Sequence, residues 1–134
     1  MTITLDPLPA APNRVPRARL IFDGQPSGQV LDGACLEAEF AVAAGHLLFV
    51  TDDVPFEEGL RLHLIAADGR LLDTRSLHQA YASPMLRDVR RIAADRFHFR
   101  FLGPALMEIR VRERPCRWCW RGRWLVLRRL REAA

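Results

Sequence analysis

Two cysteines near the end of the chain, Cys116 and Cys119, form a C-x-x-C motif. This spacing is typical of half a zinc site or of a thiol redox pair. Structural zinc takes four ligands, however, and the sequence has neither a second C-x-x-C nor a close pair of histidines. A thioredoxin-like pair opens a helix in a βαβ setting, which the surrounding pattern does not indicate. Metal or redox function through Cys116 and Cys119 is therefore our third hypothesis, and we expect no cofactor.

Histidines and one acidic loop are the candidates for acid-base or calcium chemistry. His63 and His98 alternate with apolar residues, so both should face away from the core and lie on the surface. Four carboxylates of a single loop offer oxygen ligands: Asp52, Asp53, Glu57 and Glu58. Their spacing is not that of an EF-hand, and we interpret them as solvated charge. The sequence has no G-x-S-x-G, P-loop or G-x-G-x-x-G pattern, and we expect no enzymatic activity.

The C-terminal segment carries the strongest binding signal. From Arg110 onward it holds nine arginines against two glutamates, together with all three tryptophans. Arginine binds phosphate by charge and tryptophan stacks on bases, but the same residue types anchor protein interfaces and suit acidic membrane surfaces. The candidate binding residues are Arg117, Trp118, Trp120, Arg121, Arg123 and Trp124. The competing interpretation places the tryptophans in the core, with the arginines at its rim.

Charge is unevenly distributed along the chain. All 20 basic residues are arginines, which we attribute to codon bias in a GC-rich bacterial genome rather than to selection for phosphate contacts. Residues 1–60 hold 3 arginines and 9 acidic residues, whereas residues 61–134 hold 17 arginines and 7 acidic residues. Such asymmetry predicts either internal charge complementarity or a basic surface for an acidic partner.

Length and composition fit one globular domain. The 134 residues are 49% hydrophobic and 27% charged. The sequence has no apolar run long enough to span a bilayer and no basic start followed by an apolar segment, so we expect a cytoplasmic protein. Three cysteines, an odd number, do not suggest a disulfide framework. Four prolines in residues 1–16 predict a flexible arm, and residues 17–134 are expected to form a single β-rich domain.

The clearest structural element is a β-hairpin over residues 96–112. Phenylalanines alternate with polar residues from Arg96 to Phe101, and the same alternation resumes from Met107 to Arg112. With a loop at residues 103–105, Phe99 would face Ile109 and Phe97 would face Val111. The polar face would then pair Arg100 with Glu108, His98 with Arg110 and Arg96 with Arg112.

Several further strands are predicted by alternation and turn chemistry. They cover residues 18–22, 29–31, 36–42, 47–50, 60–65 and 70–77. The run from Leu47 to Val50 lacks alternation, which indicates burial on both faces. Asp68 and Gly69 are the strongest short hairpin signal. Residues 51–59 are expected to form a loop, with one helical turn from Pro55 as an option.

Two regions leave an alternative open. Residues 83–92 fit either a short helix capped at Ser83 or a strand over 89–92, and we favour the strand. Residues 123–131 fit either a strand, which would place Trp118 and Trp120 on one face with Trp124, or a terminal helix.

Together these patterns predict an all-β protein, an antiparallel β-sandwich or barrel-like domain built from consecutive hairpins. For function, our first hypothesis is a non-enzymatic bacterial module that binds another protein or a second copy of itself. The second hypothesis is nucleic-acid binding through the arginine and tryptophan residues of the C-terminal segment.

Overall fold

The computed structural model describes residues 2–54, 57–80, 85–118 and 122–131, and every regular element within these ranges is a β-strand. The strands are β1 (Ile3–Pro7), β2 (Arg17–Phe22), β3 (Gln25–Asp32), β4 (Cys35–Val42), β5 (Gly45–Thr51), β6 (Glu57–Ala66), β7 (Leu71–Ala80), β8 (Arg87–Ala93), β9 (Arg96–Arg100), β10 (Leu106–Val111) and β11 (Leu125–Arg129). The prediction of an all-β, antiparallel fold of consecutive hairpins is confirmed.

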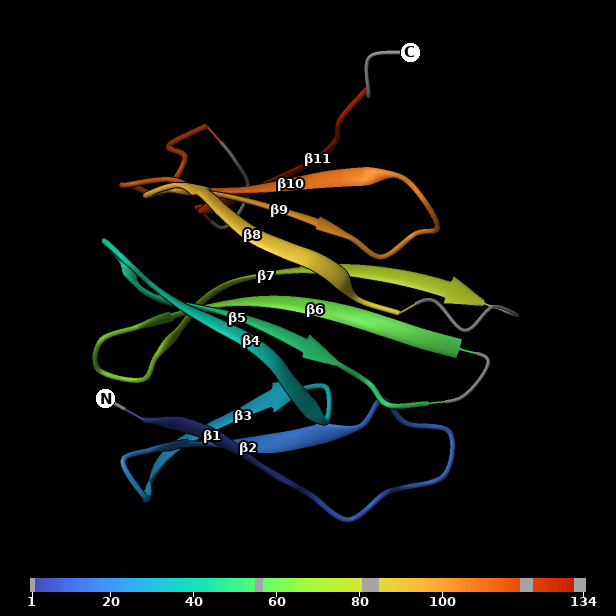
Figure 1. The fold of residues 1–134 in the computed structure, drawn as a ribbon. Helices are drawn as coiled ribbons and strands as arrows, with labels where there is room; N and C mark the ends of the chain where they lie inside the picture. Colours follow the sequence, from blue (N-terminus) through green and yellow to red (C-terminus); the bar gives the residue numbers. More distant parts are fainter. Residues whose placement is uncertain (1, 55–56, 81–84, 119–121, 132–134) are drawn as a thin grey trace.

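The strands form three open sheets that stack as layers (Figure 1). The N-terminal sheet has the order β1-β2-β3, the central sheet β4-β5-β6-β7, and the C-terminal sheet β11-β10-β9-β8. None of the three closes into a barrel, because the first and last strands in each order are not paired with each other. The central sheet lies between the other two, so both of its faces are covered.

Strand β5 shows why the central sheet is buried on both faces. Leu47 and Phe49 belong to the larger apolar cluster, shared with the C-terminal sheet, whereas Leu48 and Val50 belong to the cluster shared with the N-terminal sheet. All four side chains have no exposed surface. The interpretation of this run as a strand buried on both faces is confirmed, and its lack of alternation follows from having a protein layer on each side.

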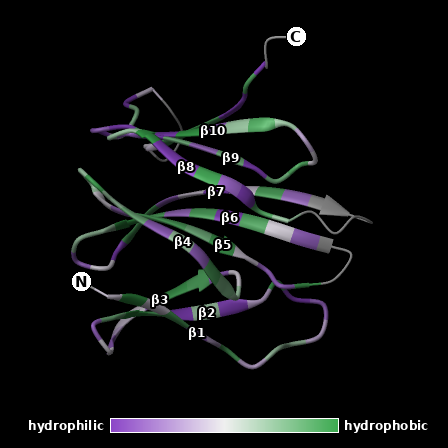
Figure 2. Cartoon of the chain, in the orientation of Figure 1, coloured by the Kyte–Doolittle hydropathy of each residue, from purple (hydrophilic) through white to green (hydrophobic). Residues whose placement is uncertain are grey.

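The C-terminal sheet, in contrast, is covered on one face only. Along its strands, hydrophobic and hydrophilic residues alternate (Figure 2), and the buried hydrophobic ones belong to the apolar cluster shared with the central sheet. The inward side chains Phe97, Phe99 and Ile109 are fully buried. This sheet therefore presents a mainly polar face to the surroundings.

The β9–β10 hairpin has the predicted alternation but not the predicted register. Phe99 pairs with Met107, whereas the sequence placed it opposite Ile109. The loop is longer than expected, running from residue 101 to residue 105, with Gly103 at a φ of 65° in the left-handed region that glycine tolerates. The pairing consequently shifts by two residues. Because side chains alternate with a period of two, each one keeps its predicted face and changes only its partner.

The structure departs from the sequence-based expectation at the N-terminus. Residues 1–16 were predicted to be a flexible arm, yet β1 pairs with β2 and buries Ile3. The proline argument failed for Pro7 because β1 lies at the edge of its sheet, where a residue without an N–H group is tolerated. Residues 3–7 thus belong to the packed domain.

Three local alternatives are also resolved. Residues 57–59, predicted as loop, begin β6, while the possible helical turn at Pro55 lies outside the described residues. Strand β8 confirms the favoured strand at residues 89–92. The terminal helix is wrong, since β11 pairs with β10, where its alternate residues Leu125 and Leu127 extend the apolar face of the sheet.

Candidate functional site

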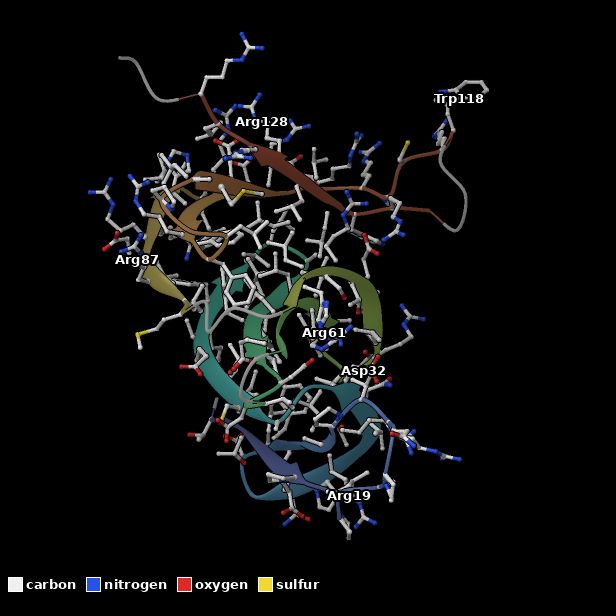
Figure 3. All side chains as sticks on the ribbon, turned by 90° about the vertical axis from the view of Figure 1, so that its right-hand side faces the viewer. Arg19, Asp32, Arg61, Arg87, Trp118 and Arg128 are labelled. Atoms are coloured by element: carbon white, nitrogen blue, oxygen red, sulfur yellow. The ribbon has the colours of Figure 1, made fainter. Side chains whose placement is uncertain are left out.

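The outer face of the C-terminal sheet carries an unusual concentration of arginines. Its outward-facing charged residues comprise six arginines and two acidic residues: Arg87, Arg90, Arg96, Arg100, Arg110, Arg128, Asp88 and Glu108. We call this set the basic face. It forms the top layer of the molecule in Figure 3, where Arg87 and Arg128 are labelled. A regular sheet with its other side packed on the core fixes the backbone positions of these side chains.

One row across the basic face is internally neutralised. Glu108 lies between His98 and Arg128 in the strand register. Its Oε2 is 2.9 Å from His98 Nε2, and its Oε1 accepts a hydrogen bond from Arg128 Nε at 3.1 Å and forms an ion pair with Arg128 Nη2 at 3.0 Å. Burial alone would raise the pKa of Glu108, but the His98 hydrogen bond and the Arg128 charge outweigh it and hold that pKa below its usual range. The carboxylate is therefore ionised at neutral pH.

The neighbouring row has no such compensation. Arg96 and Arg110 are direct register partners on the outer face. Within the part of the chain that the structure describes, neither guanidinium forms a hydrogen bond or ion pair with another side chain. Like charges directly opposite each other on a sheet are destabilising, and Glu108, the carboxylate that lines the same hollow, is already bound by His98 and Arg128. The pair is therefore free to bind an anion from outside.

A hollow of about 240 Å³ lies over this pair. Arg96, Arg110 and Arg128 line it, together with Glu108 and Val126. Guanidinium groups bind phosphate and carboxylate through two parallel hydrogen bonds, and Arg96 and Arg110, the two arginines of the hollow that Glu108 does not bind, suit an oxyanion. The sequence analysis did not select these arginines, although it had already assigned Arg96 and Arg110 to the polar face of the hairpin.

Two of the six predicted C-terminal binding residues, Arg123 and Trp124, make contacts within the fold. Arg123 Nη1 donates to Asp73 Oδ1 at 3.0 Å and to the Thr74 carbonyl at 2.9 Å, and Trp124 is half-buried against the core. These two residues join β11 to β7. Arg117 is exposed, and Trp118 is 96% exposed at one end of the top layer in Figure 3. Trp120 and Arg121 lie outside the described residues.

The cysteine hypothesis stays untested, because Cys119 lies outside the described residues. Cys116 is disulfide-bonded, although the odd number of cysteines did not suggest a disulfide framework. Cys35 is a free, exposed thiol whose pKa is raised by partial burial and by the nearby charges of Asp53, Glu37 and Glu58. Among residues 2–54, 57–80, 85–118 and 122–131, no three histidine, cysteine or acidic side chains are grouped so that they could hold a metal ion.

His63 is buried, so its predicted surface position is wrong. The N-terminal sheet covers that face of β6, and His63 is only 1% exposed. Its Nε2 lies 2.8 Å from the Asp32 carbonyl, and its Nδ1 lies 2.8 Å from Thr74 Oγ1. Because a carbonyl only accepts, Nε2 carries the proton and Nδ1 accepts from the Thr74 hydroxyl. Burial lowers the pKa of His63, and the ring serves as a neutral link between sheets.

Two carboxylates of the acidic loop, Asp52 and Glu58, are structural rather than the solvated charge that the sequence suggested, whereas Asp53 is exposed as predicted. Asp52 is 6% exposed and its carboxylate is held by Arg61, with Nη2 to Oδ2 at 3.1 Å. Glu58 Oε1 accepts hydrogen bonds from the backbone N–H groups of Asp52 at 2.9 Å, Asp53 at 3.0 Å and Gly59 at 3.2 Å. These bonds satisfy the backbone where the chain enters β6. Neither Asp52 nor Glu58 is available as a calcium ligand or general base.

Comparison of the chain with protein families, with curated proteins and with solved structures finds no match. Among the described residues there is no helix of a length and apolarity that would cross a membrane.

Proposed function

We propose that this chain is a non-enzymatic binding module that holds nucleic acid on the basic face of its C-terminal sheet. The single observation that carries the proposal is the adjacent pair Arg96 and Arg110, which lack a carboxylate partner among the described residues and face a hollow of about 240 Å³. A phosphate of a nucleic-acid backbone supplies the oxygens that both guanidiniums need.

The surroundings of the pair favour a strand with many phosphates over an isolated anion. Arg90 extends the positive charge to the edge strand β8, whereas Arg128 on β11 is bound by Glu108. Trp118 stands exposed at the end of the same layer, where an indole can stack on an unpaired base. Charge on a sheet plus an exposed aromatic ring is the combination used for single-stranded nucleic acids.

Self-association through opposite charges receives less support. The acidic half of the chain would have to offer free carboxylates to the basic face of a second copy. Asp52 and Glu58 are bound internally, Glu37 Oε1 accepts a hydrogen bond from Thr51 Oγ1 at 2.8 Å, and Glu39 lies 3.5 Å from His46 Nδ1. Much of the negative charge that the sequence suggested for a partner is thus used within the fold.

A protein partner is the second candidate, and a different observation favours it. Strand β8 lies at the edge of its sheet, and most of its residues are exposed. Ile92 is 46% exposed on this strand, and Met85, just before it, is 76% exposed. An edge strand with exposed apolar residues can accept an extended segment of another protein.

Binding of a labelled single-stranded oligonucleotide, followed by fluorescence anisotropy at two salt concentrations, tests the proposal. The double variant Arg96→Gln/Arg110→Gln should weaken binding about tenfold and reduce the salt dependence, because two phosphate contacts are lost. Arg17→Gln/Arg19→Gln is the matched control, since it removes the same charge from exposed positions of β2 on the opposite outer layer. Equal losses in both variants, or no binding by the unmodified chain at low salt, would refute the proposal.

A further inference from the structure

The unpaired positive charge of the basic face is concentrated at one point. Arg96 and Arg110 lie opposite each other on β9 and β10, and their register partners on the outer strands are Ala93 on β8 and Val126 on β11. The row of residues that crosses the sheet here therefore holds two adjacent arginines between two residues without charge. An anion at this row meets two guanidinium groups at once.

The other rows of the basic face offer less free charge. At the opposite end of the sheet, Arg100 Nε lies 3.3 Å from Asp88 Oδ2, and Arg87 Nη2 donates to a backbone carbonyl at 3.2 Å. Between the two ends lies the row in which Glu108 is bound by two neighbours. Among the described residues of the basic face outside the pair, Arg90 alone forms no hydrogen bond or ion pair, and it belongs to the row of Glu108. Two free guanidinium groups are thus adjacent at the pair.

A ligand can be matched to the pair by its charge and by its oxygens. A phosphodiester inside a nucleic-acid strand carries one negative charge, so it leaves one charge of the pair unbalanced. A phosphate monoester carries about −1.5 to −2 charges at pH 7 and has three acceptor oxygens. Because a guanidinium group binds through two parallel hydrogen bonds, two such groups need more oxygens than the two unesterified ones of a diester. A monoester therefore satisfies the pair better in both respects.

We propose that the hollow over Arg96 and Arg110 selects a phosphate monoester over a phosphodiester. This inference rests on the proposed function, and it identifies the group at the pair as the terminal phosphate of the bound strand. Arg96 is exposed and Arg110 is half-buried, and both line the hollow, so their guanidinium groups can reach a ligand there. The volume of about 240 Å³ is below the roughly 300 to 1,000 Å³ of sites that enclose whole small molecules, which fits one terminal group.

The pair also lies at the end of the sheet from which the Trp118 segment departs. β10 ends at Val111, directly after Arg110, and β11 begins at Leu125, so the connection that carries Trp118 leaves and re-enters the sheet beside the row of the pair. Arg87, from the opposite end of the strands, lies on the other side of this layer in Figure 3. A strand whose terminal phosphate is held by the pair therefore has its first bases at the end of the basic face where the exposed indole stands.

Oligonucleotides of one sequence with different ends test the selection. The 5′ end carries a hydroxyl, a phosphate or a methyl phosphate, which is a terminal phosphodiester, and the fluorescent label is on the 3′ end. By anisotropy we expect the 5′-phosphate strand to bind about tenfold more tightly than the 5′-hydroxyl strand, because charge-assisted hydrogen bonds are gained. The methyl phosphate should recover little of this gain, since it carries one charge. The same series with the ends exchanged shows which end of a strand the pair holds.

Variants of the pair locate the preference. Arg96→Gln and Arg110→Gln should each reduce the advantage of the terminal phosphate from about tenfold to about twofold or less. Both should fold, because each removes one of two like charges that face each other, and the melting temperature checks this.

Arg90→Gln is the matched control, since it removes the same charge from an exposed position of the basic face outside the lining of the hollow. It should weaken binding of the phosphorylated and the hydroxyl strand by the same factor and leave their ratio unchanged. An unchanged ratio in a folded variant of the pair, or an equal loss of the ratio in Arg90→Gln, would overturn the inference.

A free nucleotide separates the inference from the proposed function. Equal affinities of the three strands, in both series, would overturn the selection of a monoester and leave the proposed function in place. If no strand binds, the proposed function is refuted. In that case, saturable binding of thymidine 5′-monophosphate but not of thymidine, measured by calorimetry, would assign the monoester to a free nucleotide. The absence of binding by thymidine 5′-monophosphate as well would refute both proposals.

Discussion

His98 Nε2 lies 2.9 Å from Glu108 Oε2 in the middle of the basic face, and the other oxygen of that carboxylate is bound by Arg128. Glu108 therefore occupies His98 Nε2 and the Arg128 guanidinium, which would otherwise be available to an anion. The carboxylate is 7% exposed, which makes these bonds important for the stability of the sheet as well.

Replacement of the Glu108 carboxylate should therefore strengthen oligonucleotide binding and lower the stability of the fold. We expect Glu108→Gln to bind a single-stranded oligonucleotide several-fold more tightly than the unmodified chain, because it frees Arg128 and removes a negative charge from the basic face. Its free energy of unfolding should fall by about 1 to 3 kcal/mol, since charge-assisted hydrogen bonds to a buried group are lost. Anisotropy and urea denaturation measure the two effects.

Asp6→Asn is the control for Glu108→Gln, because it removes one negative charge at an exposed position of β1. It should change neither quantity appreciably. Tighter binding by Asp6→Asn to the same extent would show that net charge alone governs affinity, and would contradict a specific role of the Glu108 row.

His63 gives the protein a dependence of stability on pH. The unfolded chain protonates this histidine near its ordinary pKa of 6.5, whereas burial lowers the pKa in the folded chain. The unfolded state therefore takes up more protons as the pH falls below about 6.5, and the free energy of unfolding decreases there. Above that pH the contribution is fully present.

The variant His63→Gln should consequently lose less stability than the unmodified chain between pH 7 and pH 5, although it starts from a lower value. Urea denaturation at several pH values measures the two slopes. His78→Gln, at an exposed position of β7, is the matched control and should keep the slope of the unmodified chain. Identical slopes for His63→Gln and the unmodified chain would contradict the assignment.

The sequence predicted the local pattern of the fold well, and the layers poorly. Alternation at Phe97 and Phe99 was enough to place the side chains of this hairpin on their correct faces, because every second residue of a strand lies on the same face of the sheet. The alternation did not specify which residues of β9 and β10 pair, because the pairing depends on the length of the loop between the two strands. A shift of two residues around Gly103 keeps every side chain on the same face and therefore satisfies the same alternation. The alternation around His63 was read correctly as a strand, but no local pattern shows that a third sheet covers its polar face.

The same limitation explains why the candidate site was missed. The sequence marked the arginines and tryptophans that are close together in the chain, such as Arg123 and Trp124, and these turned out to hold β11 against β7. Arg96 and Arg110 are 14 positions apart and become adjacent only in the observed register. The predicted register paired Arg110 with His98, so the unpartnered arginine pair could not be recognised from the pattern alone.

The ion pair of Arg61 and Asp52 should be the most sensitive charged contact between the central sheet and the loop before β6. The two side chains are 16% and 6% exposed. We expect Arg61→Met to lower the free energy of unfolding by about 3 to 5 kcal/mol, because it leaves a buried carboxylate without its partner. The double variant Asp52→Asn/Arg61→Met should be more stable than the single one. A single variant as stable as the double, by urea denaturation, would show that the pair is not coupled.

Trp118 offers the most direct test of how nucleic acid would meet the basic face. With a 96% exposed indole it makes almost no contact that stabilises the fold, whereas Trp124 packs against the core. Stacking of a base on Trp118 should quench part of the tryptophan emission when an oligonucleotide is added, and the loss of this stacking should cost about 1 to 3 kcal/mol of binding free energy.

We therefore expect Trp118→Ala to weaken binding and reduce the quench without changing the melting temperature. Trp124→Phe should lower the melting temperature and retain the quench. If the quench persists in Trp118→Ala and disappears in Trp124→Phe, the oligonucleotide meets another part of the molecule.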